Sequence, residues 1–383
     1  MTGKGDKGMN PITAETKGIA SAYCQLDDLR VHYLQAGRSD QPCIVLLHGF
    51  PELAYSWRKN IVPLAEAGYH VIVPDQRGFG RTTGWDDRYE ADLYPFSTLG
   101  MAGDIIRLVT ALGKEHVRLI AGHDSGAQIA AACALLRPDI FQSVIALSTP
   151  YAGAPRRTPG QVRLIRPLAE DETIRGLADL PVPRKHYTVY YSSEMANRDL
   201  MNAPQGLEGW FRGYFYAKSG QWEGNRPEPP AGWTPEELAR IPTYYIMNRD
   251  EDMAQTAQAY LDALQGQPFP CGWLTDEDVR VYAEEYGRTG FQGGLNGYRC
   301  GTGGLNARQL ALFSGRKIEV PFLYLTGEQD WGTWQFPGTV ETMEKEASDQ
   351  YRGTVFIQHA GHWVQQEQPE AVNREILCFL STL

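Results

Sequence analysis

The sequence predicts an α/β fold: a mostly parallel sheet flanked by helices, with a mainly helical segment inserted into it. Two observations predict this class. Short apolar runs typical of buried strands alternate with segments whose apolar residues recur at helical spacing. This alternation stops at Thr149-Pro150 and returns at Val320, and the intervening chain is rich in Tyr, Trp, Pro, Gly and Arg. We therefore expect one core built from two separated parts of the chain, with a cap between them.

The strands and helices of the core follow in order. Strands are expected at 21–25 and 30–34, which form a hairpin around Asp27-Asp28, and then at 43–47, 71–73, 117–121, 143–147, 320–325 and 353–358. Helices are expected at 57–67, 98–112, 127–137, 338–348 and 369–383. The helix at 98–112 shows the pattern clearly, because its apolar residues recur three and four positions apart until Gly113.

These elements divide the chain into four parts. Residues 1–18 are rich in Gly and Lys and are expected to be a leader or a strap over the body. Residues 19–150 form the first part of the core, residues 151–316 the cap, and residues 317–383 the second part of the core. We find no internal repeat.

Composition excludes several classes of protein. The net charge of −10 argues against nucleic-acid or anionic-membrane partners. No apolar run is long enough to span a membrane, and the chain start has no apolar segment typical of a signal peptide. The six cysteines are scattered, which indicates a reducing, cytoplasmic setting, and no pattern predicts a metal site. The sequence does not determine the oligomeric state, and a homodimer stays open.

The segment Gly122-His123-Asp124-Ser125-Gly126 lies between an expected strand and an expected helix. A Gly-x-nucleophile-x-Gly segment at such a turn holds its central residue strained, with the side chain exposed above the sheet. That residue is Asp124. A carboxylate that attacks carbon forms an alkyl ester, so this segment predicts the opening of an electrophilic sp³ carbon rather than ester hydrolysis. The alternative is that Asp124 only caps the following helix.

Two more ionisable residues follow strands of the second core part. Asp330 follows the strand at 320–325, and His362 follows the strand at 353–358. Functional residues gather beyond the carboxyl ends of parallel strands, so both are expected beside Asp124. The chain order Asp, Asp, His is the nucleophile, acid, base order of an α/β-hydrolase. Glu328 is the alternative acid, and His359 and a purely structural role for His362 are the alternatives for the base.

The segment His48-Gly49-Phe50-Pro51 supplies the other half of the predicted site. The backbone N–H groups of Phe50 and Ser125 are expected to point at one oxygen of the nucleophile and to form an oxyanion hole. The Phe50–Pro51 bond is a candidate for a cis peptide.

These motifs, together with Gly361-His362-Trp363, resemble those of the epoxide hydrolases of the α/β-hydrolase fold. The stretch from Gly290 to Arg299 is similar to the family segment that bears one of two ring-opening tyrosines, and the resemblance puts this role on Tyr298. The stretch from Tyr187 to Tyr191 resembles the segment that bears the second, and the resemblance puts that role on Tyr190. The cap is rich in tyrosine, so four more candidates for the place of Tyr190 stay open: Tyr187, Tyr191, Tyr214 and Tyr216.

The resemblance implies hydrolysis of an epoxide to a vicinal diol, with water as co-substrate and no cofactor. Asp124 would attack the epoxide, the two tyrosines would assist ring opening, and His362, oriented by Asp330, would activate water to cleave the ester. Two features depart from the family: Ser125 stands where Trp is usual, and the cap has a long extension around 218–270. The aromatic cap favours an apolar epoxide.

Two further functions stay open. A haloalkane or haloacid dehalogenase shares the Asp, His and Asp residues, but the dehalogenases use either a Trp beside the nucleophile or arginines one and four residues after it. Here those two positions hold Ser125 and Gln128. The second possibility is a non-catalytic ligand-binding protein on the same fold, since a fold does not determine a function.

Overall fold

The computed structural model describes residues 18–156, 160 and 165–383, so nearly all of the expected leader lies outside the described residues. Eight strands of the described chain form one sheet in the order β1-β2-β4-β3-β5-β6-β9-β10. β2 runs antiparallel to β1 and β4, and the remaining neighbours are parallel. The opening hairpin and the mostly parallel sheet that the sequence predicts are therefore both present.

The strands agree with the expected positions to within three residues at their ends. They are β1 (Ala20–Gln25), β2 (Arg30–Ala36), β3 (Cys43–Leu47), β4 (His70–Pro74), β5 (Val117–His123), β6 (Val144–Leu147), β9 (Phe322–Gly327) and β10 (Tyr351–Ile357). Every residue of β3, β4 and β6 is buried. Strands covered on both faces bury both sets of side chains, which explains why they appear in the sequence as continuous apolar runs.

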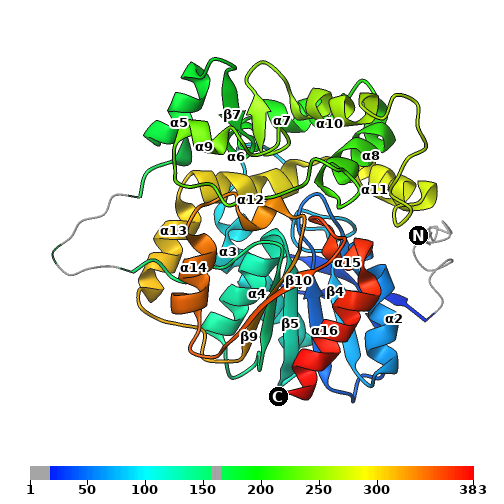
Figure 1. The fold of residues 1–383 in the computed structure, drawn as a ribbon. Helices are drawn as coiled ribbons and strands as arrows, with labels where there is room; N and C mark the ends of the chain where they lie inside the picture. Colours follow the sequence, from blue (N-terminus) through cyan, green and yellow to red (C-terminus); the bar gives the residue numbers. More distant parts are fainter. Residues whose placement is uncertain (1–17, 157–159, 161–164) are drawn as a thin grey trace.

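Helices flank this sheet (Figure 1). They are α2 (Arg58–Glu66), α3 (Thr98–Ala111), α4 (Ser125–Leu136), α14 (Thr339–Thr342), α15 (Val364–Glu367) and α16 (Pro369–Ser381). α2 packs on α16, and α3 packs on α4. Local sequence sets their starts: the Ser97 hydroxyl accepts a hydrogen bond from the Gly100 N–H at the start of α3, and Pro369 opens α16. The helix expected at 338–348 is instead the short α14 followed by a π-helical turn at Met343–Ala347.

The chain between β6 and β9 is mainly helical. Its helices are α5 (Glu172–Gly176), α6 (Tyr187–Tyr191), α7 (Met195–Met201), α8 (Gly206–Lys218), α9 (Pro235–Leu238), α10 (Met253–Asp262), α11 (Asp276–Thr289), α12 (Gln292–Thr302) and α13 (Leu305–Leu310). α5 to α11 form the upper lobe in Figure 1, and α12 lies between that lobe and the sheet. We retain the proposal that residues 151–316 are an inserted cap.

The cap also contains a small antiparallel sheet that the sequence pattern does not predict. It pairs β7 (Arg184–His186) with β8 (Ile246–Asn248). Strands of three residues are too short to show a period of two. This pair brings the start of α6 next to the segment after α9, where the Tyr187 N–H donates to the Tyr245 carbonyl oxygen at 2.8 Å. Short 3₁₀ turns occur at Ala54–Trp57, Tyr94–Phe96, Leu168–Glu170, Leu177–Asp179, Ala311–Phe313 and Trp331–Thr333.

None of the described helices has the length and apolar composition needed to cross a bilayer.

Candidate active site

Asp124 lies at the sharp turn between β5 and α4. Its φ of 54° and ψ of −120° are rare for a residue with a side chain. The turn requires the two flanking glycines: a Cβ on Gly122 would lie 2.0 Å from the Gly126 carbonyl oxygen, and one on Gly126 would lie 2.5 Å from the His48 carbonyl oxygen. The Asp124 side chain makes no capping hydrogen bond to α4, which removes the interpretation of Asp124 as a helix cap.

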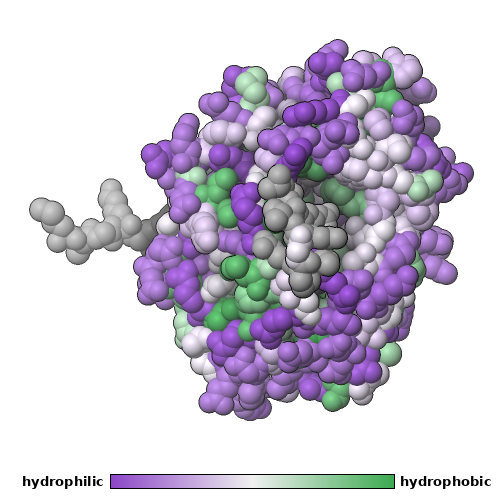
Figure 2. Space-filling model, turned by 90° about the vertical axis from the view of Figure 1, so that its left-hand side faces the viewer, coloured by the Kyte–Doolittle hydropathy of each residue, from purple (hydrophilic) through white to green (hydrophobic). Residues whose placement is uncertain are grey.

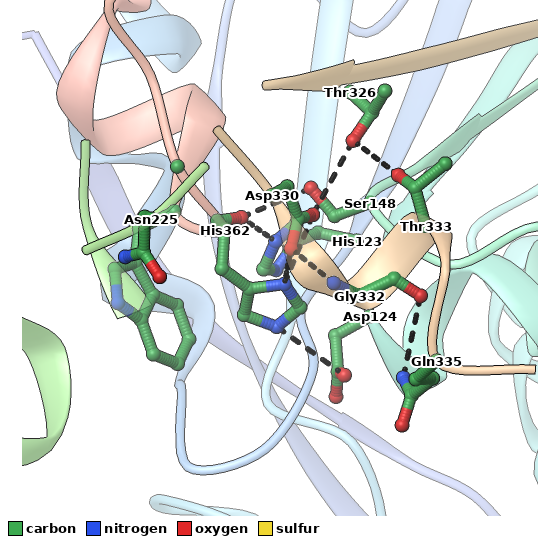
Figure 3. A network of polar contacts seen from close by, with 12 residues as sticks. His123, Asp124, Ser148, Asn225, Thr326, Asp330, Gly332, Thr333, Gln335 and His362 are labelled. Carbon is green, nitrogen blue, oxygen red and sulfur yellow. Dashed lines mark hydrogen bonds and ion pairs between the residues drawn. The ribbon is translucent and has the colours of Figure 1, made fainter. Parts of the chain in front are cut away.

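The structure brings Asp124, Asp330 and His362 together (Figure 3). His362 Nε2 lies 3.5 Å from Asp124 Oδ2, and His362 Nδ1 lies 3.2 Å from both carboxylate oxygens of Asp330. Asp330 is buried and is held by the Gly332 N–H at 2.6 Å. The rival acid Glu328 and the rival base His359 are both exposed.

The charges of this cluster shift its titration. Burial alone would lower the pKa of His362, but the charge of Asp330 and hydrogen bonds to Asp124 and Asp330 raise this pKa to about 9. Burial alone would raise the pKa of Asp124. The hydrogen bond and positive charge of His362 nevertheless hold the pKa of that carboxyl well below its usual range. The resting site is therefore a carboxylate paired with an imidazolium at neutral pH.

One oxygen of Asp124 already has a backbone donor. The Phe50 N–H donates to Asp124 Oδ1 at 3.0 Å, and the Phe50–Pro51 peptide is cis. Ser125 is the first residue of α4, and its N–H remains a predicted second donor. Oδ1 and Oδ2 are thus distinguished: the backbone holds the first, and the second faces His362.

The cap tyrosines separate into those near Asp124 and those away from it. Tyr298 and Tyr187 line one cavity with Asp124, and burial together with the charge of Asp124 raises both phenolic pKa values well above 10. Tyr190 does not line this cavity. Its hydroxyl donates to Asp199 Oδ2 at 3.1 Å, and Lys185 lies over its ring.

The prediction for Tyr190 thus differs from the structure, because the single turn of α6 directs Tyr190 toward α7. Tyr187, at the start of that turn, lines the cavity together with Asp124. Tyr191 packs against the rings of Phe50 and Tyr298, and Tyr214 stacks on Trp210. No spacing in the sequence distinguishes these tyrosines, since the five residues of α6 contain three of them.

The cavity has a volume of about 460 Å³. Asp124, Ser125, Tyr187 and Tyr298 line it together with mainly apolar side chains: Phe50, Phe79, Phe96, Met101, Ile129, Ile165, Leu168 and Phe336. Figure 2 views the molecule from the side of α5, α13 and α14, where hydrophobic side chains gather among hydrophilic ones. Such a cavity accepts a small apolar molecule.

Two buried groups that the sequence analysis did not single out support His362. His123 Nδ1 lies 2.5 Å from Glu52 Oε2, and His123 Nε2 lies 2.6 Å from the backbone oxygen of His362. Glu52 also accepts from the Gly49 N–H, so it links the Phe50 loop to the base. Glu52 directly follows the His48–Pro51 segment and His123 directly precedes Asp124 in the sequence. That these two side chains pair with each other depends on the fold.

Lys218, at the end of α8, is the third such group, and only 3% of it is exposed. Its charge lowers the pKa of Asp124 and opposes the rise in that of His362. No sequence pattern predicts that this lysine of α8 is buried beside the site. In the described part of the chain, no group of three or more His, Cys, Asp or Glu side chains could hold a metal ion.

Comparisons with known proteins agree with this geometry. Residues 42–184 match the model of the family described as alpha/beta hydrolase fold. Epoxide hydrolase B of Mycobacterium tuberculosis is 32% identical over 92% of this chain and 96% of its own, and epoxide hydrolase A of the same organism is 31% identical over 93% and 95%.

Solved structures show the same relationship. An epoxide hydrolase from an endophytic Streptomyces superposes with a TM-score of 0.74 at 28% identity, covering 95% of this chain and 96% of that one. Potato (Solanum tuberosum) epoxide hydrolase I gives a TM-score of 0.72 at 27% identity, covering 95% and 100%. These relatives match nearly the whole chain, cap included, and the chain therefore belongs to the epoxide hydrolases of the α/β-hydrolase fold.

Proposed function

We propose that this enzyme converts an apolar epoxide to a vicinal diol through an alkyl ester on Asp124, in two chemical steps. One observation carries this proposal. The residue at the strained turn is a carboxylate, with one oxygen on the Phe50 N–H and the other facing His362, below the phenols of Tyr187 and Tyr298.

In the first step Asp124 Oδ2 attacks the less hindered epoxide carbon, and the bond from that carbon to the ring oxygen breaks. The ring oxygen takes a proton from a phenol of the cap. We assign the two phenols to Tyr298 and Tyr187, rather than to Tyr298 and Tyr190, because Tyr187 shares the cavity with the nucleophile. Their raised pKa values keep both phenols protonated, as a proton donor requires.

In the second step His362 Nε2 removes a proton from water, and the water oxygen attacks the ester carbonyl carbon. Asp124 Oδ1 becomes the oxyanion, which the Phe50 N–H and the expected Ser125 N–H stabilise. The bond from this carbon to Oδ2 then breaks, and the proton on His362 passes to the leaving alkoxide. Oδ2 leaves in the diol and Asp124 keeps the oxygen of water. The remaining proton of water replaces the one that the phenol gave to the ring oxygen, and no step requires a cofactor.

A dehalogenase is a weaker fit to this cavity. A halide ion needs N–H donors, whereas the side chains beside the nucleophile are Ser125 and Gln128, and the Gln128 amide already donates to the Pro150 carbonyl oxygen at 3.0 Å. The two phenols suit an oxygen leaving group, which has to gain a proton. A non-catalytic binding protein would leave the paired Asp124, His362 and Asp330 without a role.

The test is single turnover of styrene oxide in ¹⁸O-water, with mass analysis of the peptide that contains Asp124. We expect ¹⁸O in the Asp124 carboxylate of the wild type after turnover, and an ester that persists in His362→Ala. Diol formation without label in Asp124 would indicate direct attack by water and would overturn the nucleophile assignment. Release of halide from a halo-substrate, with no turnover of any epoxide, would favour the dehalogenase.

A further inference from the structure

Lys218 is a buried cation next to the catalytic cluster. Five aromatic rings surround its ammonium, with centroids 4.3–5.8 Å from Nζ: Tyr245, Tyr214, Tyr187, Tyr244 and Trp363. No carboxylate of the described residues lies within 4.0 Å of Nζ, and no described residue accepts a hydrogen bond from it. Burying an unpaired charge in this way is expensive, so a lysine at this position calls for an explanation.

The rings explain how the charge is tolerated. The faces of Tyr and Trp rings attract a cation, most strongly where water is excluded. Burial lowers the pKa of Lys218 to about 8, although the charges of Asp124 and Asp330 oppose this shift. The lysine therefore stays mostly protonated at neutral pH.

The backbone fixes Lys218 beside the base. The His362 N–H donates to the Lys218 carbonyl oxygen at 2.8 Å, and the Trp363 ring belongs to the cage. The Trp363 indole N–H donates in turn to the Phe215 carbonyl oxygen in the same helix as Lys218, at 2.9 Å. Because α8 and the loop that carries His362 are joined in this way, the cation keeps its position relative to the imidazole.

His362 faces charged and titratable groups from several elements. Asp330 and Asp124 bind its two nitrogens, and Lys218 acts from α8. The ring of His123 lies 4.9 Å away and is paired with Glu52 on its far side. Glu367 accepts from the N–H groups of Gly361 and Trp363, on either side of the base. Lys218 is therefore the cation that opposes the carboxylates around the imidazole.

This balance changes during the reaction, if the function proposed above holds. Ester formation removes the negative charge of Asp124, and Asp330 alone then favours the imidazolium. We propose that Lys218 is a positioning residue whose charge keeps His362 unprotonated while the ester stands on Asp124, so that the imidazole can accept a proton from water. The proton that His362 releases balances the one that the phenol gave to the ring oxygen.

The experiment measures how fast the Asp124 ester decays at different pH values, in single turnovers of styrene oxide. Decay slows at low pH because His362 becomes protonated. The pH at which the decay rate falls to half its maximum is the midpoint. In Lys218→Met, we expect this midpoint to move up by about one pH unit, which slows ester decay about tenfold at pH values below both midpoints. Lys218→Arg, which keeps the charge, should retain the wild-type midpoint.

Lys185→Met is the matched control. Lys185 also lies over a cap tyrosine, with Nζ 4.9 Å from the Tyr190 ring centroid, but the charges that act on it are Asp252, Asp199, Asp250 and Glu251. Its loss should leave the midpoint unchanged. A purely structural role of Lys218 would instead slow decay equally at all pH values, and this result, or an unchanged midpoint in Lys218→Met, would overturn the inference.

Two further outcomes are separable. Absence of any ester in the wild type contradicts the proposed function itself, whereas a wild-type ester with the same midpoint in Lys218→Met contradicts only the role of Lys218. If the Lys218 variants do not fold, NMR titration of ¹³C-labelled lysine in the wild type still tests the inference, because it measures whether the Lys218 amine is protonated at neutral pH. A Lys218 amine that is unprotonated at neutral pH would exclude the proposed charge.

Discussion

At the residue scale, the most informative difference from the sequence prediction concerns the second tyrosine. Tyr187 and Tyr190 lie three positions apart in α6, but only Tyr187 lines the cavity with Asp124, and the Tyr190 hydroxyl is bound to Asp199. We expect Tyr187→Phe to lower kcat/KM for styrene oxide about a hundredfold, because ring opening loses a positioned proton donor. Tyr190→Phe should stay close to the wild type. Steady-state kinetics of the two variants test this assignment. A large loss in Tyr190→Phe with little change in Tyr187→Phe would show that Tyr190 is the second proton donor.

A second prediction at this scale concerns the resting protonation of His362. The negative charge of Asp330 and the hydrogen bonds to both carboxylates overcome burial and raise its pKa to about 9. Asp124→Asn removes one of the groups that raise this value, so the pKa of His362 should fall. NMR titration of the imidazole in the wild type and in Asp124→Asn measures the change. An equal or higher pKa in the variant would show that Asp124 does not stabilise the imidazolium.

Some parts of the site are predictable from the sequence, and others depend on contacts that no sequence pattern records. Asp124, Asp330 and His362 each follow a strand, so strand positions and the rule about carboxyl ends of parallel strands were enough to bring them together. The choice between Tyr187 and Tyr190 depends on how a single helical turn is rotated, which no periodicity records. The burial of Lys218 depends on rings from three other segments of the chain, and sequence spacing does not determine such a contact.

At the scale of elements, the turn between β5 and α4 has the strictest requirements. A Cβ at Gly122 would lie 2.0 Å from a backbone oxygen of Gly126, and the backbone on both sides is fixed by the sheet and the helix. We expect Gly122→Ala to lower the free energy of unfolding by about 3 kcal/mol or more, since no flexible side chain can move away.

Gly103→Ala is the control for this prediction. Gly103 lies inside α3, and a Cβ there would meet no atom within 4 Å. The substitution should raise the free energy of unfolding by about 0.5–1 kcal/mol, because Ala favours the helix more than Gly does. Urea unfolding of both variants measures the contrast, and two similar changes would contradict the steric argument.

The elements also differ in how well the sequence predicts them. The buried core strands appear as continuous apolar runs, because both of their faces are covered, and their positions were predicted to within a few residues. The pair β7 and β8 was not predicted, since its strands have three residues each and contact each other across about sixty residues of chain. Local patterns thus describe the core better than the cap, whose arrangement depends on contacts between distant segments.

At the scale of the whole molecule, the proposed mechanism requires the cap to be held on the core, since Asp124 and the phenols of Tyr187 and Tyr298 come from different parts. A buried ion pair joins them: Arg58 Nε, in α2 of the core, lies 2.7 Å from Asp278 Oδ1, in α11 of the cap. The Tyr55 hydroxyl donates to the same oxygen at 2.9 Å. α11 leads directly into α12, which carries Tyr298, so a loosened α11 should also displace the phenol that we propose as a proton donor.

The final prediction tests this connection with a double-mutant cycle of Arg58→Met and Asp278→Asn. Each single variant leaves one buried charge without its oppositely charged partner and should lose about 3 kcal/mol of unfolding free energy, whereas the double variant should lose less than the sum. Arg280→Met removes an exposed pair with Glu277 on the same helix and should change stability by less than about 0.5 kcal/mol. If the pair positions the cap for catalysis, kcat falls in the singles with the same non-additivity as stability. Additive losses in both measurements would mean that Arg58 and Asp278 act independently, and that other contacts hold α11 and Tyr298 over the nucleophile.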